Sequence, residues 1–374
     1  MNHSKFSCCL VLLFLMLTES QAQKLNLLIG TYTKPGKSEG IYVYDFDVAT
    51  GKASYKNKAA GLNNPSYLAL SKNQNFVYAV TEAGPGKGTV SAFTFDKKSG
   101  DLTLLNSKPS GGDGPCYVSI DKKSQHVFVA NYSGGSFSAI PILKDGSLKE
   151  PVQTVTFIAN GTGNGQQAKP HAHSTVLSPD EKYVYVSDLG NDEILGYKYS
   201  GSAPKPLAVW HTIKLPKGSG PRHFTFHPNK KFGYSVQELS CDVVAYSYKK
   251  GKLTFLQSIS SLANGYTGRK WSADIHISPD GKFLYSSNRD DANEIAIFSI
   301  QKDGRLTLVG RQTTLGKAPR NFVIDPTGNY LLAANQNSDS IIIFKRDHVT
   351  GLLSNTGEKI ELSAPVCLKF AEGE

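Results

Sequence analysis

Short stretches in which apolar and polar residues alternate recur along almost the whole chain. In one representative unit they occupy residues 222–226, 232–237, 243–248 and 253–259. A period of two is typical of strands that bury one face, and Pro-Asn or Asp-Gly pairs between such stretches indicate hairpin turns. The pattern therefore predicts antiparallel units of four strands, and a content of 35 Gly, 18 Tyr and 18 Phe favours such short strands over long helices.

The unit repeats six times, and each copy carries a turn directly after its first strand. The turn centres are residues 72, 122, 179, 228, 279 and 326, which lie 47 to 57 residues apart. Four strands in about 50 residues are the signature of one blade of a β-propeller.

Two leftover pieces at the ends of the chain complete a further unit. Residues 364–370 match a first strand, and residues 27–31, 41–47 and 53–58 match strands two to four. Pairing them closes a ring and removes the exposed sheet edges of an open array. We therefore predict an all-β, seven-bladed β-propeller of four-stranded antiparallel blades, with six or eight blades as the alternatives, and a single domain over residues 23–374.

The first 22 residues read as a secretory signal peptide. Lys5 precedes an apolar stretch at residues 8–17, and Ser20-Gln21-Ala22 supplies small residues before a cut after Ala22. The stretch is shorter than the roughly 20 residues that span a bilayer, so we expect no membrane span. The prediction is a signal peptide at 1–22 and an exported protein, periplasmic or secreted, that is a monomer or a weak homodimer.

The net charge of +10 raises the question of a nucleic-acid partner, but the lysines are scattered singly or in pairs. No basic helix or aromatic-basic platform accompanies them, so we expect no nucleic-acid binding. Cys116, Cys241 and Cys367 are too few for a disulfide framework.

Aligning the units on their turns, with the first strand innermost, places two sets of residues at one mouth of the ring. The start of a first strand and the end of a second strand are neighbours in an antiparallel hairpin. The first-strand slot holds Ser66, Cys116, His173, Arg222, Ala273, Arg320 and Val366. The second-strand slot holds Glu82, Tyr132, Leu189, Glu238, Arg289 and Gln336, with Asn131 and Asn288 one position earlier. Charged groups near a channel axis are costly unless they are paired or bind a ligand, so we expect the functional site here.

The richest group comes from three adjacent blades and consists of His173, Arg222, Glu238 and Arg289, the predicted catalytic residues. Guanidinium groups bind carboxylate or phosphate in a bidentate manner, and His and Glu can move protons near neutral pH. A cyclic ester of a sugar acid suits this combination. Further substrate contacts are predicted for His171, Arg320, Tyr132, Asn131, Asn288, Gln336 and Glu82.

Other interpretations of these residues remain open. The Arg222–Glu238 pair is also explained as a structural link between blades. His171 and His173 could chelate zinc from one face of a strand, but no signature of further ligands accompanies them, so we expect no metal and no cofactor. Local hydrogen bonding accounts for the remaining histidines of these strands and turns, which are His223, His227 and His276.

Several motifs together make the chain similar to a known family. They are KPHAHSTVLSPD at residues 169–180, SDLGND at 187–192, GPRHFTFHP at 220–228, VQEL at 236–239 and SSNR at 286–289. These stretches resemble the seven-bladed propeller lactonases, which include the propeller type of 6-phosphogluconolactonase and the fungal carboxy-cis,cis-muconate cyclases. The resemblance implies a metal-independent site in which His173 is the acid/base and Arg222 and Arg289 bind the anion, with Glu238 as the fourth matching position.

Three functions follow from this interpretation. The first is hydrolysis of a sugar-acid lactone, as in 6-phosphogluconolactonase, although an exported protein would rarely meet a phosphorylated intermediate of cytosolic sugar metabolism. An unphosphorylated aldonolactone or another carboxylated lactone fits export better. The second is a muconate-type cycloisomerase, which would form or open the lactone without water. The third is a propeller without catalysis that binds a sugar acid or a partner protein.

Overall fold

The computed structural model describes residues 24–34, 37–160 and 165–373. The predicted signal peptide, residues 1–22, lies outside the described residues. Within them, no helix has the length and apolar character needed to cross a membrane.

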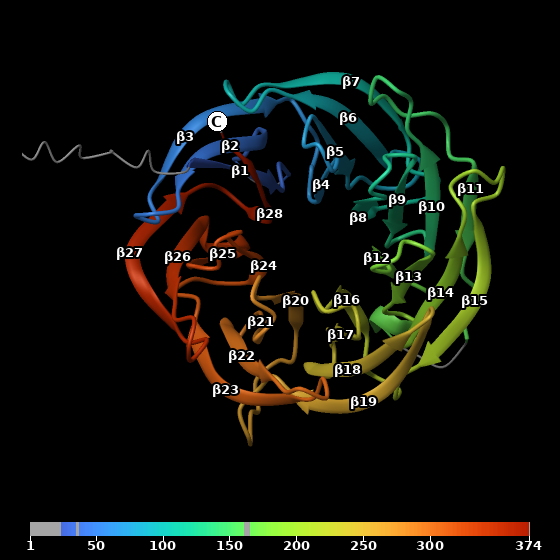
Figure 1. Cartoon of the computed structure of the whole chain (residues 1–374). Helices are drawn as coiled ribbons and strands as arrows, with labels where there is room; N and C mark the ends of the chain where they lie inside the picture. The colour runs from blue at the N-terminus through green and yellow to red at the C-terminus, as the bar shows by residue number, and fades with distance from the viewer. Residues whose placement is uncertain (1–23, 35–36, 161–164, 374) are drawn as a thin grey trace, which may run out of the picture.

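Seven four-stranded antiparallel sheets are arranged in a ring, which confirms the predicted propeller (Figure 1). The blades are numbered here from the first complete unit, so that blade 7 contains both chain ends. The innermost strands of blades 1 to 7 are β4 (Leu68–Leu70), β8 (Pro115–Ile120), β12 (Ala172–Leu177), β16 (Pro221–Phe226), β20 (Ser272–Ile277), β24 (Pro319–Ile324) and β28 (Pro365–Glu372). The second strands are β5 (Phe76–Thr81), β9 (His126–Asn131), β13 (Tyr183–Asp188), β17 (Phe232–Gln237), β21 (Phe283–Asn288), β25 (Tyr330–Asn335) and β1 (Lys24–Thr31).

The third and fourth strands form the outer part of each blade. The third strands are β6 (Thr89–Phe95), β10 (Ser136–Pro141), β14 (Glu193–Tyr199), β18 (Asp242–Lys249), β22 (Glu294–Ile300), β26 (Ser340–Arg346) and β2 (Gly40–Asp47). The outermost strands are β7 (Leu102–Pro109), β11 (Gln153–Thr156), β15 (Leu207–Lys214), β19 (Lys252–Ser260), β23 (Leu306–Thr313), β27 (Leu353–Glu361) and β3 (Ala53–Ala60). Two short 3₁₀ helices, η1 (Gly165–Gln167) and η2 (Gln336–Ser338), complete the assigned elements.

The ring closes as predicted, through pairing of the two ends of the chain. The C-terminal strand β28 pairs antiparallel with β1 in blade 7, and Figure 1 shows the red and blue strands side by side. The Nδ2 of Asn26 also donates to the carbonyl of Glu372 at 3.0 Å. The inner strand of this blade is therefore supplied from the far end of the sequence.

Apolar clusters and a repeated tyrosine contact hold neighbouring blades together. Tyr234 of blade 4 packs with Leu284 and Phe298 of blade 5, and its hydroxyl donates to the carbonyl of Gly304 at 3.0 Å. Tyr285 repeats this contact one blade later, on Gly351 at 2.7 Å. Gly351 has a φ of +75°, and a Cβ there would lie 2.3 Å from the Phe283 ring, so only glycine fits this turn. The contacts make the ring a rigid support for residues at its mouth.

A β-bulge falls at the first-strand slot in several blades. In β16, Pro221 pairs with Gln237 and His223 with Val236, so Arg222 is the extra residue. The same irregularity skips His173 in β12 and Arg320 in β24. A bulged residue does not take part in the hydrogen-bond ladder, and the bulge changes the direction of its side chain. The slot residues are therefore placed at the mouth by a local deformation that recurs with the repeat.

Candidate active site

Glu238 lies at the centre of the charged cluster, just beyond the end of β17. Its Oε2 is 2.8 Å from the Nε of Arg222 and 2.9 Å from an Nη2 of Arg289. All three side chains are buried, with 1% of Arg222, 3% of Glu238 and 5% of Arg289 exposed. Burial opposes ionisation of Glu238, but the two guanidiniums and a Trp271 hydrogen bond outweigh it and lower its pKa. The carboxylate therefore stays charged at neutral pH.

Trp271 fixes the other oxygen of this carboxylate. Its Nε1 donates to Oε1 of Glu238 at 2.6 Å. The guanidiniums of Arg269 and Arg289 lie 3.7 Å and 4.4 Å from the centroid of its ring, which is the geometry of cation–π contacts. Trp271 precedes β20 and was not among the residues predicted from the sequence. Its position two residues before the first-strand slot at Ala273, which corresponds to that of His171 before His173, was the available signal.

Arg320 faces the same cluster without a carboxylate partner of its own. Among the described residues it forms no ion pair within 4.0 Å, and its guanidinium lies 5.3 Å from the centroid of the Tyr32 ring. Burial opposes its charge, but Tyr32, Glu82 and Glu238 raise the pKa of Arg320 above its usual value. A guanidinium that is charged and unpaired has its donors available for an anion.

Glu82 and Gln336 line a pocket next to Arg320. The pocket has a volume of about 570 Å³, and its lining includes Tyr32, Lys34 and Lys37. The Oε2 of Glu82 accepts hydrogen bonds from Tyr32 at 2.8 Å and from Ser66 at 2.5 Å. The structure thus brings these two predicted residues to the mouth, on the side of blades 7, 1 and 6.

His173 is buried among positive groups, with 4% of the residue exposed. Its Nδ1 lies 3.9 Å from the thiol of Cys116, and within the described part of the chain its Nε2 has no hydrogen-bond partner. Burial, followed by the charges of Arg222 and other neighbours, lowers the pKa of His173 well below its usual value. His173 is therefore a neutral imidazole at pH 7.

Tyr132 connects His173 with His171. Its ring stacks on His171 at 4.2 Å between centroids and meets His173 edge-on at 5.3 Å. The Nδ1 of His171 donates to the carbonyl of Tyr132 at 2.8 Å. Among the described residues, no three His, Cys, Asp or Glu side chains are grouped so as to hold a metal ion.

Asn131 and Asn288 are not brought to the mouth, contrary to the prediction. Both are completely buried. Asn131 donates to Ser136 at 3.2 Å within its own blade, and Asn288 accepts from Ser261 and Ser272. Successive residues of a strand point to opposite faces of the sheet. A residue one position before the second-strand slot therefore points away from the mouth, and its side chain bonds to neighbouring strands.

A row of hydrogen-bonded polar side chains lies behind Arg222, and the sequence did not predict that its members are connected. The Nη1 of Arg222 lies 3.2 Å from the Nε2 of His223, whose Nδ1 lies 2.7 Å from Asp274. Asp274 also accepts from the Nε2 of His276 at 2.9 Å. His223 and His276 are satisfied locally, as predicted, but their partner is one shared carboxylate.

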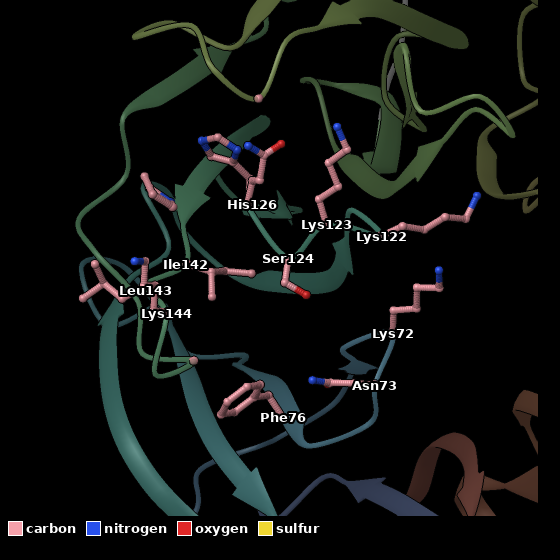
Figure 2. Close-up of a pocket in the computed structure, with 14 residues that line it drawn as sticks. Lys72, Asn73, Phe76, Lys122, Lys123, Ser124, His126, Ile142, Leu143 and Lys144 are labelled. Carbon is pink, nitrogen blue, oxygen red and sulfur yellow. The ribbon is translucent and has the colours of Figure 1, made fainter.

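A larger pocket lies on the other face of the propeller from the mouth that holds the Glu238 cluster. Its lining includes the turns that follow β4 and β8. Its volume is about 750 Å³, and Figure 2 shows Lys72, Lys122 and Lys123 beside it, with Phe76 below. None of the described residues that line it is Asp or Glu. We therefore place the candidate active site at the Glu238 cluster, where a carboxylate, an imidazole and three guanidiniums meet.

Comparison with known proteins agrees with this assignment of the fold and family. A sequence profile described as "Lactonase, 7-bladed beta-propeller" matches residues 26–370. The 6-phosphogluconolactonases of Formosa agariphila and Bacillus subtilis are each 38% identical, over 92% and 91% of this chain and 99% and 97% of their own. The structure of the periplasmic gluconolactonase of Pseudomonas aeruginosa, 35% identical, matches with a TM-score of 0.89 over 94% of this chain and 100% of its own. The chain therefore belongs to the lactonase family of seven-bladed β-propellers.

Proposed function

We propose that this protein is a carboxylic-ester hydrolase that opens the lactone of a sugar acid with water, as the names of its 6-phosphogluconolactonase and gluconolactonase relatives suggest. The reaction takes place at the Glu238 cluster. The names of the relatives support the reaction class, and the geometry of the cluster supports the roles assigned below.

The observation that carries the proposal is the surplus of positive charge around one neutral imidazole. Arg222 and Arg289 share the charge of Glu238, while Arg320 has no carboxylate within 4.0 Å among the described residues. Such a site favours a substrate that carries a negative charge or develops one on its carbonyl oxygen. Hydrolysis of an ester develops that charge when water attacks.

The roles of the residues follow from their protonation states. His173 is neutral and its Nε2 is without a protein partner in the described chain, so it can accept a proton from the attacking water. Arg222 stabilises the oxyanion that forms on the carbonyl. The intermediate then expels the ring oxygen, which takes the proton back from the imidazolium and leaves a hydroxy acid. Glu238 holds the two guanidiniums in place, because its Oε2 faces both of them and its Oε1 accepts from Trp271.

The pocket lined by Tyr32 and Glu82 suits the remote part of a sugar-acid lactone. Its volume of about 570 Å³ lies within the range of ligand pockets, roughly 300 to 1,000 Å³. Arg320 and the nearby Lys34 and Lys37 would bind a phosphate or a second carboxylate there. Export of the protein would favour an unphosphorylated aldonolactone, and substrate comparison decides between the two.

The test is a pH-stat assay of the purified protein against gluconolactone, 6-phosphogluconolactone and uronic-acid lactones. In H₂¹⁸O the hydroxy-acid product must carry one solvent oxygen, whereas a cycloisomerase product would carry none. His173→Gln and Arg222→Met should each lower kcat/KM at least about 100-fold, since each removes a group that acts in the transition state. His211→Gln, in the outer strand β15 of the same blade as His173, is the matched control. Unchanged turnover in His173→Gln and Arg222→Met would refute the proposal.

A further inference from the structure

A row of buried hydrogen bonds extends from Arg222 down the channel. Arg222 donates from Nη1 to the carbonyl of Ala273 at 2.7 Å, and the same nitrogen lies 3.2 Å from the Nε2 of His223. The Nδ1 of His223 lies 2.7 Å from Oδ1 of Asp274. Only 5% of His223 and 1% of Asp274 are exposed, so water cannot replace these partners freely.

The contact with Arg222 determines which nitrogen of His223 carries the proton. A guanidinium can only donate, so the Nε2 of His223 must present its lone pair. The proton is then on Nδ1, which donates it to Asp274. Burial, followed by the charge of Arg222, lowers the pKa of His223 to about 4 despite the neighbouring carboxylate. His223 is therefore neutral at pH 7, as this arrangement requires.

The carboxylate of Asp274 accepts hydrogen bonds from several donors. Its Oδ1 accepts from the backbone N–H of Ile275 at 2.9 Å, in addition to His223. Its Oδ2 accepts from His276 at 2.9 Å and from the side chain of Asn321. Burial opposes ionisation, yet His276 and His223 hold the pKa of Asp274 well below its usual value. A carboxylate surrounded by donors fixes the Nδ1–H form of His223.

We propose that His223 and Asp274 are positioning residues for Arg222 in lactone opening, acting by fixing the Nδ1–H tautomer of His223. The inference rests on the proposed function, but the tautomer can be measured without turnover. Neither residue reaches the reacting atoms in this role. They set the direction of the Arg222 guanidinium, whose misplacement by about 1 Å can cost about 100-fold in rate.

The direct test is ¹⁵N NMR of protein labelled at histidine, with His223 assigned by the signal that disappears in His223→Gln. The His223 signal should show Nδ1 protonated and Nε2 unprotonated at pH 7. In Asp274→Asn the carboxamide cannot accept from all of these donors, so the His223 signal should shift or divide between tautomers. A wild-type protein with Nε2 protonated would overturn the proposal.

Kinetics of a matched pair of variants separates positioning from packing. His223→Gln retains an acceptor oxygen for Arg222, whereas His223→Leu does not. We expect kcat/KM to fall about 100-fold in His223→Leu and less than about tenfold in His223→Gln, with similar melting temperatures. Lys369 lines the same part of the channel as His223 and Asp274 but does not belong to their hydrogen-bonded row. Lys369→Met is therefore the control and should behave as wild type. Equal loss in the His223 pair, or no loss in either, would refute the positioning role.

The two proposals can fail separately. If no lactone is hydrolysed but the His223 tautomer is as expected, the proposed function fails. The hydrogen bonds that join Arg222, His223 and Asp274 then still stand as described. Binding of 6-phosphogluconate, measured by tryptophan fluorescence, then replaces turnover and should rank the same variants in the same order. If lactone is hydrolysed and His223→Leu matches wild type, only the positioning role fails.

Discussion

The Nε of Arg222 lies 2.8 Å from Oε2 of Glu238, yet its N–H is not directed at that oxygen. The contact is an ion pair without a well-aligned hydrogen bond. The same holds for the Nε of Arg289, which is buried without a hydrogen-bond partner while its Nη2 pairs with the same oxygen. Glu238 therefore acts on both guanidiniums chiefly through its charge.

Glu238→Gln tests this dependence on charge. The substitution preserves shape but leaves two buried guanidiniums without a counter-ion, and breaking such a buried pair costs about 3 to 5 kcal/mol. We expect that loss in the free energy of unfolding, measured by urea denaturation at pH 7. Glu39→Gln breaks the exposed pair with Lys58 and should not change stability measurably. Equal stability of the two variants would show that the charge of Glu238 is not needed to compensate Arg222 and Arg289.

Arg320→Met should separate ligand binding from stability. Arg320 has no ion-pair partner among the described residues, so its loss leaves no carboxylate uncompensated at close range. A charge-assisted hydrogen bond contributes about 1.5 to 3 kcal/mol, so 6-phosphogluconate should bind about 10- to 100-fold more weakly, while the melting temperature stays the same. In a Trp210→Phe background, Trp271 is the one tryptophan left of two, and its fluorescence reports binding.

Gluconate is the informative comparison for that experiment. If Arg320 binds the phosphate, Arg320→Met removes the preference for the phosphorylated acid. If it binds the carboxylate or the sugar hydroxyls, both acids lose affinity equally. Arg305→Met, which removes a guanidinium on a surface turn beside Asp303, should change neither. Undiminished affinity in Arg320→Met would exclude Arg320 from the site.

Acid should destabilise the fold through its buried neutral histidines. The pKa values of His173 and His223 are lowered in the folded state by burial, while an unfolded histidine takes up a proton near pH 6.5. Below that pH the unfolded state binds more protons, so stability is complete above about 6.5 and falls as the pH drops toward the folded pKa values. Each histidine contributes a slope of up to about 1.4 kcal/mol per pH unit.

Urea denaturation at pH 7.5, 6.0 and 5.0 measures this slope. His173→Gln should give a shallower decline between pH 6.5 and 5 than the wild-type protein. His211→Gln, on the outer strand β15, is the control and should keep the wild-type slope. A His173→Gln variant with an unchanged slope would show that folding does not lower the pKa of His173.

The sequence predicted the ring because its signals are local and repeated. Alternation with a period of two marks strands such as β17, whose predicted and observed bounds are both 232–237, and the turns set the blade length. The slots at Arg222, Glu238 and Arg289 follow from the same alignment. The bulge that displaces Arg222 does not, because it depends on how two strands pair across the repeat.

The residues that were missed or misplaced share one physical reason. Trp271 and Asp274 lie beside the slots and not in them, and each gains its role from a partner in a neighbouring blade. Asn131 and Asn288 lie beside the slots too, but their side chains turn into the sheet. Side-chain direction at a strand end changes with every residue, and alignment of the repeats alone does not resolve it.

Closure of the ring by β28 should be necessary for the fold and not merely compatible with it. Deletion of residues 365–374 removes the inner strand of blade 7 and exposes the edge of β1, including the buried side chains of Leu27 and Ile29. An unpaired, apolar edge strand promotes aggregation. We expect loss of the cooperative unfolding transition, followed by circular dichroism, and aggregation measured by light scattering. A chain that lacks only residues 373–374 keeps every β1–β28 pair and should unfold like the complete chain. A cooperative transition in the longer deletion would show that the fold does not depend on β28.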